Sequence, residues 1–145
     1  MNKENSEIQD TLIKGVQAHQ ASRHEEASAA YLLILKDAPD HADANHLLGL
    51  IAHQSGNHDK AIQLIKKAIK ANGTASPFHN NLGNAHKAIG NLQSAADSYR
   101  MALTIKPDDS GTLSNLGLAL AELGSSEEAI DCYKSALQID PNILD

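Results

Sequence analysis

Residues 110–143 read SGTLSNLGLALAELGSSEEAIDCYKSALQIDPNI, and this stretch decides the fold because the chain before it repeats its pattern. A shift of 34 residues aligns the Leu-Gly pair at 116–117 with the pairs at 82–83 and 48–49. The same shift aligns the glycines at 124, 90 and 56, and the alanines at 129, 95 and 61. One further step back lie Gly15, Ala27, Tyr31 and Pro39. A period of this length indicates an array of one repeated supersecondary unit.

These residues resemble the tetratricopeptide repeat, with repeats at 8–41, 42–75, 76–109 and 110–143 after an N-terminal extension of residues 1–7. The first repeat departs from the family at Lys14 and Ile34, as terminal repeats commonly do. The fourth repeat carries the complete signature: Leu113, Leu116, Gly117, Leu120, Ala129, Tyr133, Ala136 and Pro141. The resemblance implies an all-α fold, a right-handed superhelical solenoid of four helix-turn-helix repeats covering 8–145.

Local signals predict two helices in each repeat, the first of about 13 residues and ending near Gly or Ser. Capping-box sequences begin at Ser22 and Ser125, and Ser76 precedes Pro77 as an expected N-cap. Glycine in the middle of a helix is costly, so we expect close helix crossings at Gly49, Gly83 and Gly117. Two sets of second-helix residues should pack around them: Ala61, Ala95 and Ala129 facing the glycines, and Tyr31, Ile65, Tyr99 and Tyr133 filling the gap toward the next repeat.

The amino-acid composition disfavours several classes of function. Of 145 residues, 41% are hydrophobic but only 3% aromatic, which suits closely packed helices better than an enclosed pocket with aromatic walls. The formal charge of −6 disfavours nucleic acid and anionic membranes, which are held by excess Lys and Arg. The single cysteine, Cys132, can form no internal disulfide, and there is no long apolar run, so we expect a cytoplasmic protein.

The eight histidines raise the question of a metal site. His46 and His53 share one predicted helix, and His79 and His86 share another. Seven residues correspond to about 10.5 Å of helix rise, whereas two ligands of one metal on a helix are normally three or four residues apart. We therefore expect surface or groove histidines, no metal and no cofactor. No nucleophile elbow or glycine-rich phosphate loop is present either, so we expect no enzyme.

The family resemblance implies a concave groove lined by the first helix of each repeat. Its ligand-contacting positions map onto Asn80, Asn81, Asn84, Asn115, Lys87, His46, Leu47, Leu50, His53 and His19. The two-carboxylate clamp of co-chaperones matches at Asn84 and Asn115 but has Asn80 where its first lysine belongs. The segment 79–84, HNNLGN, resembles more closely the asparagine ladder of the O-linked N-acetylglucosamine transferase superhelix, with Asn81 and Asn115 as rungs.

We therefore expect a non-enzymatic scaffold that binds a peptide or helix of a partner protein in this groove. The alternative is a targeting or oligomerisation arm of a larger enzyme such as a glycosyltransferase, since the chain stops two residues after a repeat ends. Self-association through the terminal repeats is a third expectation. Leu32 and Leu33 should be covered by residues 1–7 or by a second copy. At the C-terminal end no later helix follows, so we expect that five residues cannot all be covered: Tyr133, Ala136, Leu137, Ile143 and Leu144.

Overall fold

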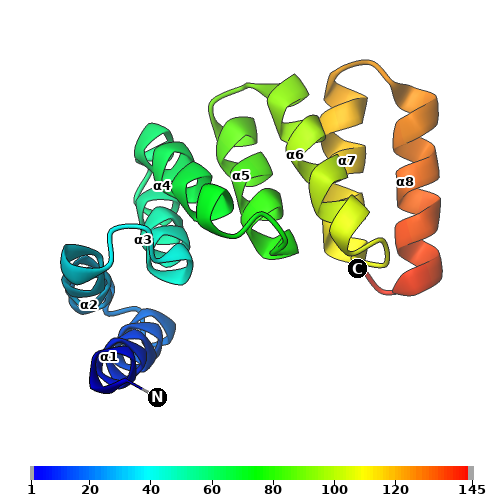
Figure 1. The fold of residues 1–145 in the computed structure, drawn as a ribbon. Helices are drawn as coiled ribbons and strands as arrows, with labels where there is room; N and C mark the ends of the chain where they lie inside the picture. Colours follow the sequence, from blue (N-terminus) through cyan, green and yellow to red (C-terminus); the bar gives the residue numbers. More distant parts are fainter. Residues whose placement is uncertain (1, 144–145) are drawn as a thin grey trace. The chain divides into compact units, whose positions relative to one another are not determined.

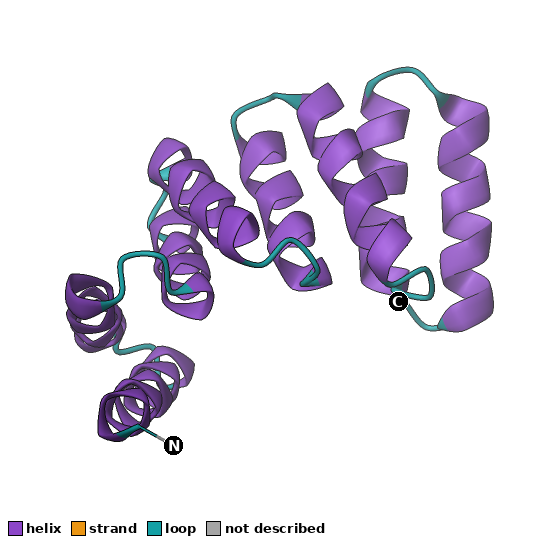
Figure 2. Cartoon of the chain, in the orientation of Figure 1, coloured by secondary structure: helices purple, strands orange, loops and turns teal. Residues whose placement is uncertain are grey.

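The computed structural model describes residues 2–143 and consists of helices joined by short turns (Figure 1). Figure 2 shows helix and loop but no strand in this range. The expected all-α fold is confirmed. The helices are α1 (Lys3–Gln20), α2 (His24–Asp37), α3 (Ala42–Gln54), α4 (His58–Ala71), α5 (Ser76–Ala88), α6 (Leu92–Ile105), α7 (Ser110–Glu122) and α8 (Ser126–Ile139).

The chain divides into an N-terminal half, Met1–Asn72, and a C-terminal half, Gly73–Asp145, with two helix pairs in each. In the N-terminal half α1 packs on α2, α2 on α3 and α3 on α4; α5 to α8 pack in the same sequential way. The first helices α3, α5 and α7 are 13 residues long and begin where repeats two to four were expected to begin. Helix α1 has 18 residues, more than expected, because it already starts at Lys3. Within residues 2–143, no helix is long and apolar enough to cross a membrane.

The helix pairs cross closely at a glycine. The nearest side chain is a tyrosine ring, or Ile65 at Gly49, where the backbone oxygen of the expected Ala61 is also close. A Cβ added at Gly83 would lie 2.5 Å from Cε1 of Tyr99, and one at Gly15 would lie 2.6 Å from Cε1 of Tyr31. Gly117 meets Tyr133 in the same way. The tyrosines also reach the next repeat as predicted, because Tyr31 lies in one buried cluster with Leu48 of α3, and Tyr99 in another with Leu116 of α7. A flat ring needs the space that a missing side chain leaves, so ring and glycine pair within one repeat.

The turn inside each pair requires a left-handed residue. Gly56, Gly90 and Gly124 have φ of 85°, 81° and 85°, and Ser22 takes the equivalent position in the first repeat with φ of 59°. The residue in this conformation lies before the second helix, so the capping box expected at Ser22 does not form.

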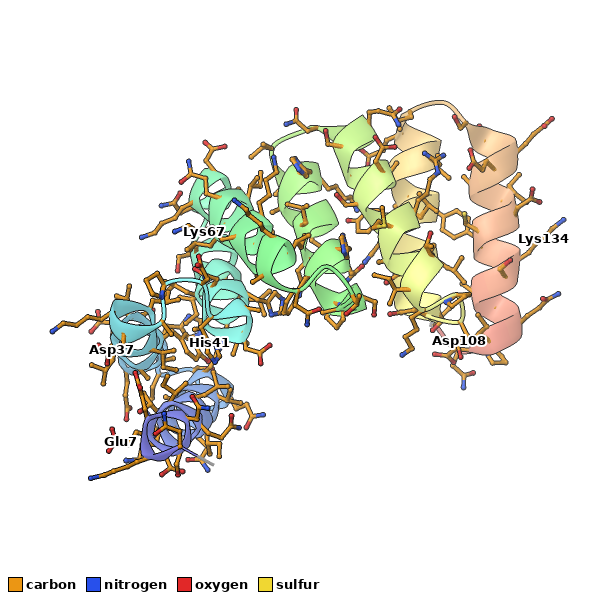
Figure 3. All side chains as sticks on the ribbon, viewed as in Figure 1. Glu7, Asp37, His41, Lys67, Asp108 and Lys134 are labelled. Atoms are coloured by element: carbon orange, nitrogen blue, oxygen red, sulfur yellow. The ribbon has the colours of Figure 1, made fainter. Side chains whose placement is uncertain are left out.

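The actual helix caps differ from those that the sequence predicted. Ser125 takes the N-cap position of α8 without a side-chain hydrogen bond. Ser76 is the first helical residue of α5 and not its cap. Side-chain caps occur elsewhere: Ala44 N donates to His41 Nδ1, and Thr112 N donates to Asp109 Oδ1. Figure 3 labels His41 at the start of α3.

The ends of the repeat array are only partly covered. Leu32 and Leu33 remain 54% and 57% exposed, although Leu33 lines a surface depression together with Glu4 and Glu7 of α1. Residues of the expected extension thus adjoin Leu33 without covering it. At the C-terminal end, Ala136 is buried while Leu137 is 38% exposed, so these residues are not all covered. Tyr133 and Ile143 are half-buried, and Leu144 lies outside the described residues.

Candidate functional site

Three of the predicted groove asparagines meet in the C-terminal half. Asn80 and Asn84 lie one turn apart on α5, and Asn115 lies on α7. Asn115 Nδ2 donates to Asn80 Oδ1 over 3.2 Å and, more weakly, to Asn84 Oδ1 over 3.5 Å. All three side chains are half-buried. We call these three residues the amide cluster; it joins the first helices of two successive repeats.

Two hydroxyl groups that the sequence analysis missed complete the amide cluster. Tyr99 Oη donates to Asn84 Oδ1 over 2.7 Å, and Thr112 Oγ1 donates to Asn80 Oδ1 over 3.1 Å. Tyr99 and Thr112 are 0% and 1% exposed, so their hydroxyls depend on protein partners. A signal was present in the sequence, because only the third repeat combines an asparagine at its ninth position with a tyrosine 15 residues later.

These bonds fix which way the side-chain amides point. The carbonyl oxygens of Asn80 and Asn84 each accept two internal bonds, so they are occupied. With the two amides reversed, the Tyr99 hydroxyl would become an acceptor and its buried hydrogen would lose its partner, which is costly. None of these four bonds uses the Nδ2 groups of Asn80 and Asn84. The amide cluster therefore offers a ligand mainly N–H donors.

The first repeat shows what happens when the asparagine is missing. Tyr31 is the equivalent of Tyr99 and is likewise 0% exposed. Val16 stands in the place of Asn84, and Tyr31 Oη has no hydrogen-bond partner within the described residues. Burial raises the pKa of Tyr31, and it raises the pKa of Tyr99 to about 12. Both phenols are thus neutral near pH 7, but only Tyr99 has a bonding role.

The other predicted groove residues of α5 flank the amide cluster. Lys87 is half-buried and follows Asn84 by three residues, on the same face of the helix. Asn81, the predicted ladder rung, is half-buried and already takes part in an interaction within the protein. The structure thus brings Asn115 together with Asn80 and Asn84, whereas the resemblance paired it with Asn81.

In the N-terminal half, the predicted groove residues are more apolar and partly engaged. Leu47, Leu50, His19 and His53 are half-buried. His19 Nε2 lies 2.9 Å from Gln54 Oε1, and His53 is bonded to a neighbouring ring. At the predicted groove positions, the N-terminal half therefore carries hydrocarbon and imidazole side chains.

His46 does not fit its predicted role. It is only 8% exposed, and burial lowers its pKa from 6.5 to about 4, although the nearby Asp43 opposes that shift. Because α3 turns this side chain toward the protein interior, His46 offers a ligand little surface. His79 and His86 are 8% and 9% exposed, so the expectation of surface or groove histidines was wrong for them too. His79 Nε2 lies 2.9 Å from the carbonyl oxygen of Gly73.

Comparison with solved structures identifies similar arrays. A crystal structure of MamA shares 25% identity with this chain, with a TM-score of 0.83 over 90% of this chain and 76% of MamA. A Thermobaculum terrenum O-GlcNAc transferase mutant shares 29% identity, with a TM-score of 0.79 over 83% of this chain and 23% of the transferase. YrrB, with 18% identity and a TM-score of 0.80 over 90% of this chain and 67% of YrrB, supports the fold alone. No curated protein sequence is significantly similar.

Family models describe the same repeats. Two models of the tetratricopeptide repeat match this sequence, one at residues 15–77 and the other at 76–109 and 111–143. Repeats of this family are typically non-catalytic protein-interaction modules. The matches at 76–109 and 111–143 coincide with the helix pairs α5–α6 and α7–α8, whereas the match at 15–77 begins within α1 and ends within α5. The chain therefore belongs to the tetratricopeptide repeat family.

Proposed function

We propose that the chain is a non-enzymatic scaffold that binds an extended segment of a partner protein along α5 and α7. The observation that supports this most directly is the polarity of the amide cluster. The buried hydroxyls of Tyr99 and Thr112 donate to the side-chain oxygens of Asn84 and Asn80. The Nδ2 groups of these two asparagines are then available to donate hydrogen bonds to acceptors of a ligand. An extended peptide presents backbone carbonyls at regular intervals, whatever its side chains.

The proposed recognition is neutral in character. The amide cluster carries no charge, and Lys87 is the one cation among the predicted groove residues of α5. Hydrogen bonds between neutral amides are screened by salt far less than ion pairs. Affinity should therefore change little between low and high ionic strength. A steep loss of affinity with salt would instead support a charge-based clamp.

A peptide-display selection on the whole chain provides ligands for the test. The variants are Asn84→Leu and Asn115→Leu, because Leu50 and Leu47 take these positions in the second repeat and so fit the fold. Asn84→Leu should weaken binding by about 1 kcal/mol, the net value of a typical hydrogen bond. Asn115→Leu should weaken binding too, because it removes the internal bonds that help to orient the Asn80 and Asn84 amides. Lys134→Ala on the exposed side of α8 is the matched control (Figure 3). Peptides whose affinity is the same for wild type, both leucine variants and the control would refute the site.

The direction of the hydrogen bonds can be tested on the peptide itself. Reducing one backbone carbonyl at a time should weaken binding at the contacting positions, whereas N-methylation of the same residues should matter less. The reverse pattern would mean that the asparagines act as acceptors, and the assigned orientation of the amides would be wrong.

Two wider roles remain proposals. YrrB is described as having an unusual peptide-binding site, which favours a scaffold, whereas the transferase similarity favours an arm of a larger enzyme. Reading the gene on both sides of this sequence distinguishes the two. We also propose a cytoplasmic location and self-association through exposed apolar residues of the terminal repeats, such as Leu33 and Leu137. Light scattering over a range of concentrations tests the association.

A further inference from the structure

Two histidine rings face each other across the turn between α3 and α4. His53 is the last but one residue of α3, and His58 is the first of α4. Gly56, with φ of 85°, reverses the chain between them. The two Nδ1 atoms come to 2.9 Å from each other, and the ring centroids are 4.8 Å apart. Histidine spacing within a single helix does not reveal this pair, because its two members lie on different helices.

The facing Nδ1 atoms of the pair lie within hydrogen-bonding distance. A hydrogen bond between two Nδ1 atoms requires a donor and an acceptor, so one ring carries its proton on Nδ1 and the other on Nε2. If the first ring shifts its proton to Nε2, both facing nitrogens present lone pairs. Burial, with a further contribution from His58, lowers the pKa of His53.

The spacing of the two nitrogens suits a shared metal ion. Imidazole nitrogens bind Zn²⁺ at about 2.0–2.1 Å, so two ligands of one ion at 90–110° are about 2.8–3.4 Å apart. The observed 2.9 Å lies in this range, and binding requires the rings to turn until both Nδ1 lone pairs point at the ion. Both side chains are half-buried, so solvent still reaches the pair.

We propose that His53 and His58 form a two-histidine binding site for a divalent transition-metal ion that prefers imidazole ligands. Among such ions Cu²⁺ should bind most tightly, followed by Ni²⁺ and Zn²⁺. In residues 2–143 no group of three His, Cys, Asp or Glu side chains could hold a metal, so water or another molecule supplies the remaining ligands. The bound ion links the end of α3 to the start of α4.

The chain contains its own control for this site. His19 and His24 take the same positions one repeat earlier. Their ring centroids are 5.5 Å apart and the rings meet edge to face at 73°, while His19 Nε2 lies 2.9 Å from Gln54. The first pair therefore has the same composition without facing nitrogens. Metal binding that depends on geometry, and not merely on histidine content, should distinguish the two pairs.

Calorimetric titration of the whole chain with Cu²⁺ near pH 7.5 tests the site. His53→Gln and His58→Gln should each lower the affinity of the tightest site by about tenfold or more, whereas His24→Gln should leave it unchanged. Equal affinity in wild type and in both pair variants would overturn the proposal. So would a loss of affinity in His24→Gln as large as in His53→Gln.

A second measurement on the wild type does not depend on how the variants fold. Titration with diamagnetic Zn²⁺ should shift the Nδ1 resonances of His53 and His58 before those of any other histidine. EDTA should reverse the change. Shifts confined to other rings, or no shift at millimolar Zn²⁺, would refute the site.

Discussion

Removing the hydroxyl group from Tyr99 or from Tyr31, which take equivalent positions in two repeats, should have different effects on the stability of the protein. Tyr99 donates to Asn84 over 2.7 Å, while Tyr31 has no hydrogen-bond partner within the described residues. Both rings are 0% exposed and both pack on a glycine of the first helix, so replacement by phenylalanine keeps the apolar contacts. Tyr99→Phe and Tyr31→Phe therefore change almost nothing but the hydroxyl group.

The magnitudes follow from the bonding. Tyr99→Phe removes one buried hydrogen bond, and Asn84 Oδ1 keeps only the 3.5 Å contact from Asn115, so the free energy of unfolding should fall by about 1 kcal/mol. Tyr31→Phe removes a buried polar group that nothing satisfies, so the free energy of unfolding should stay the same or rise by up to about 1 kcal/mol. The two variants should therefore differ by about 1–2 kcal/mol.

Urea unfolding followed by circular dichroism measures both effects. The two residues lie in different halves of the chain, so if the halves unfold in separate transitions, each variant shifts its own. Val16→Asn places an asparagine beside Tyr31, at the position that Asn84 has beside Tyr99. The free energy of unfolding should therefore rise more when Val16→Asn is made in the wild type than when it is made in the Tyr31→Phe variant. An equal loss of stability in Tyr31→Phe and Tyr99→Phe would refute the reasoning, because the Tyr31 hydroxyl would then be bonded too.

Three further outcomes are expected. The pKa of His46 in the folded protein, about 4, lies below its ordinary value of 6.5, so the unfolded chain binds a proton at higher pH than the folded chain does. The free energy of unfolding should therefore fall by up to about 3 kcal/mol as the pH drops from 6.5 to 4. Denaturant unfolding at several pH values should show this loss, and His46→Leu should flatten the curve. Ser22→Gly should raise the thermal midpoint, since φ of 59° costs a non-glycine residue about 1 kcal/mol; an unchanged or lower midpoint would contradict this. Gly83→Ala should lower the free energy of unfolding in urea by about 1–3 kcal/mol, because the new Cβ would lie 2.5 Å from Tyr99 Cε1. Gly111→Ala, at an exposed position of α7, should leave the free energy of unfolding unchanged or raise it.

The array of helix pairs could be predicted from the sequence alone. The period of 34 residues, the Leu-Gly pairs and the recurring Gly56, Gly90 and Gly124 predict where each helix begins and ends. They predict the helix ends because helix propensity, the spacing of apolar residues and left-handed turns depend on residues that are close together in the sequence. The asparagines of α5 and α7 could be singled out in the same way, since their positions within the repeat are fixed by the register.

Side-chain pairing was decided only by the tertiary structure. Tyr99, and not Ala95, lies against Gly83, because the crossing of α5 and α6 sets which side chain reaches the gap. The orientation of the Asn84 amide depends on a hydroxyl from the next helix, and His53 meets His58 across a turn. Such pairs join different helices, and their distances depend on how the helices cross. The register of a repeat predicts which positions are equivalent, but only the packed helices determine which atoms come within hydrogen-bonding distance.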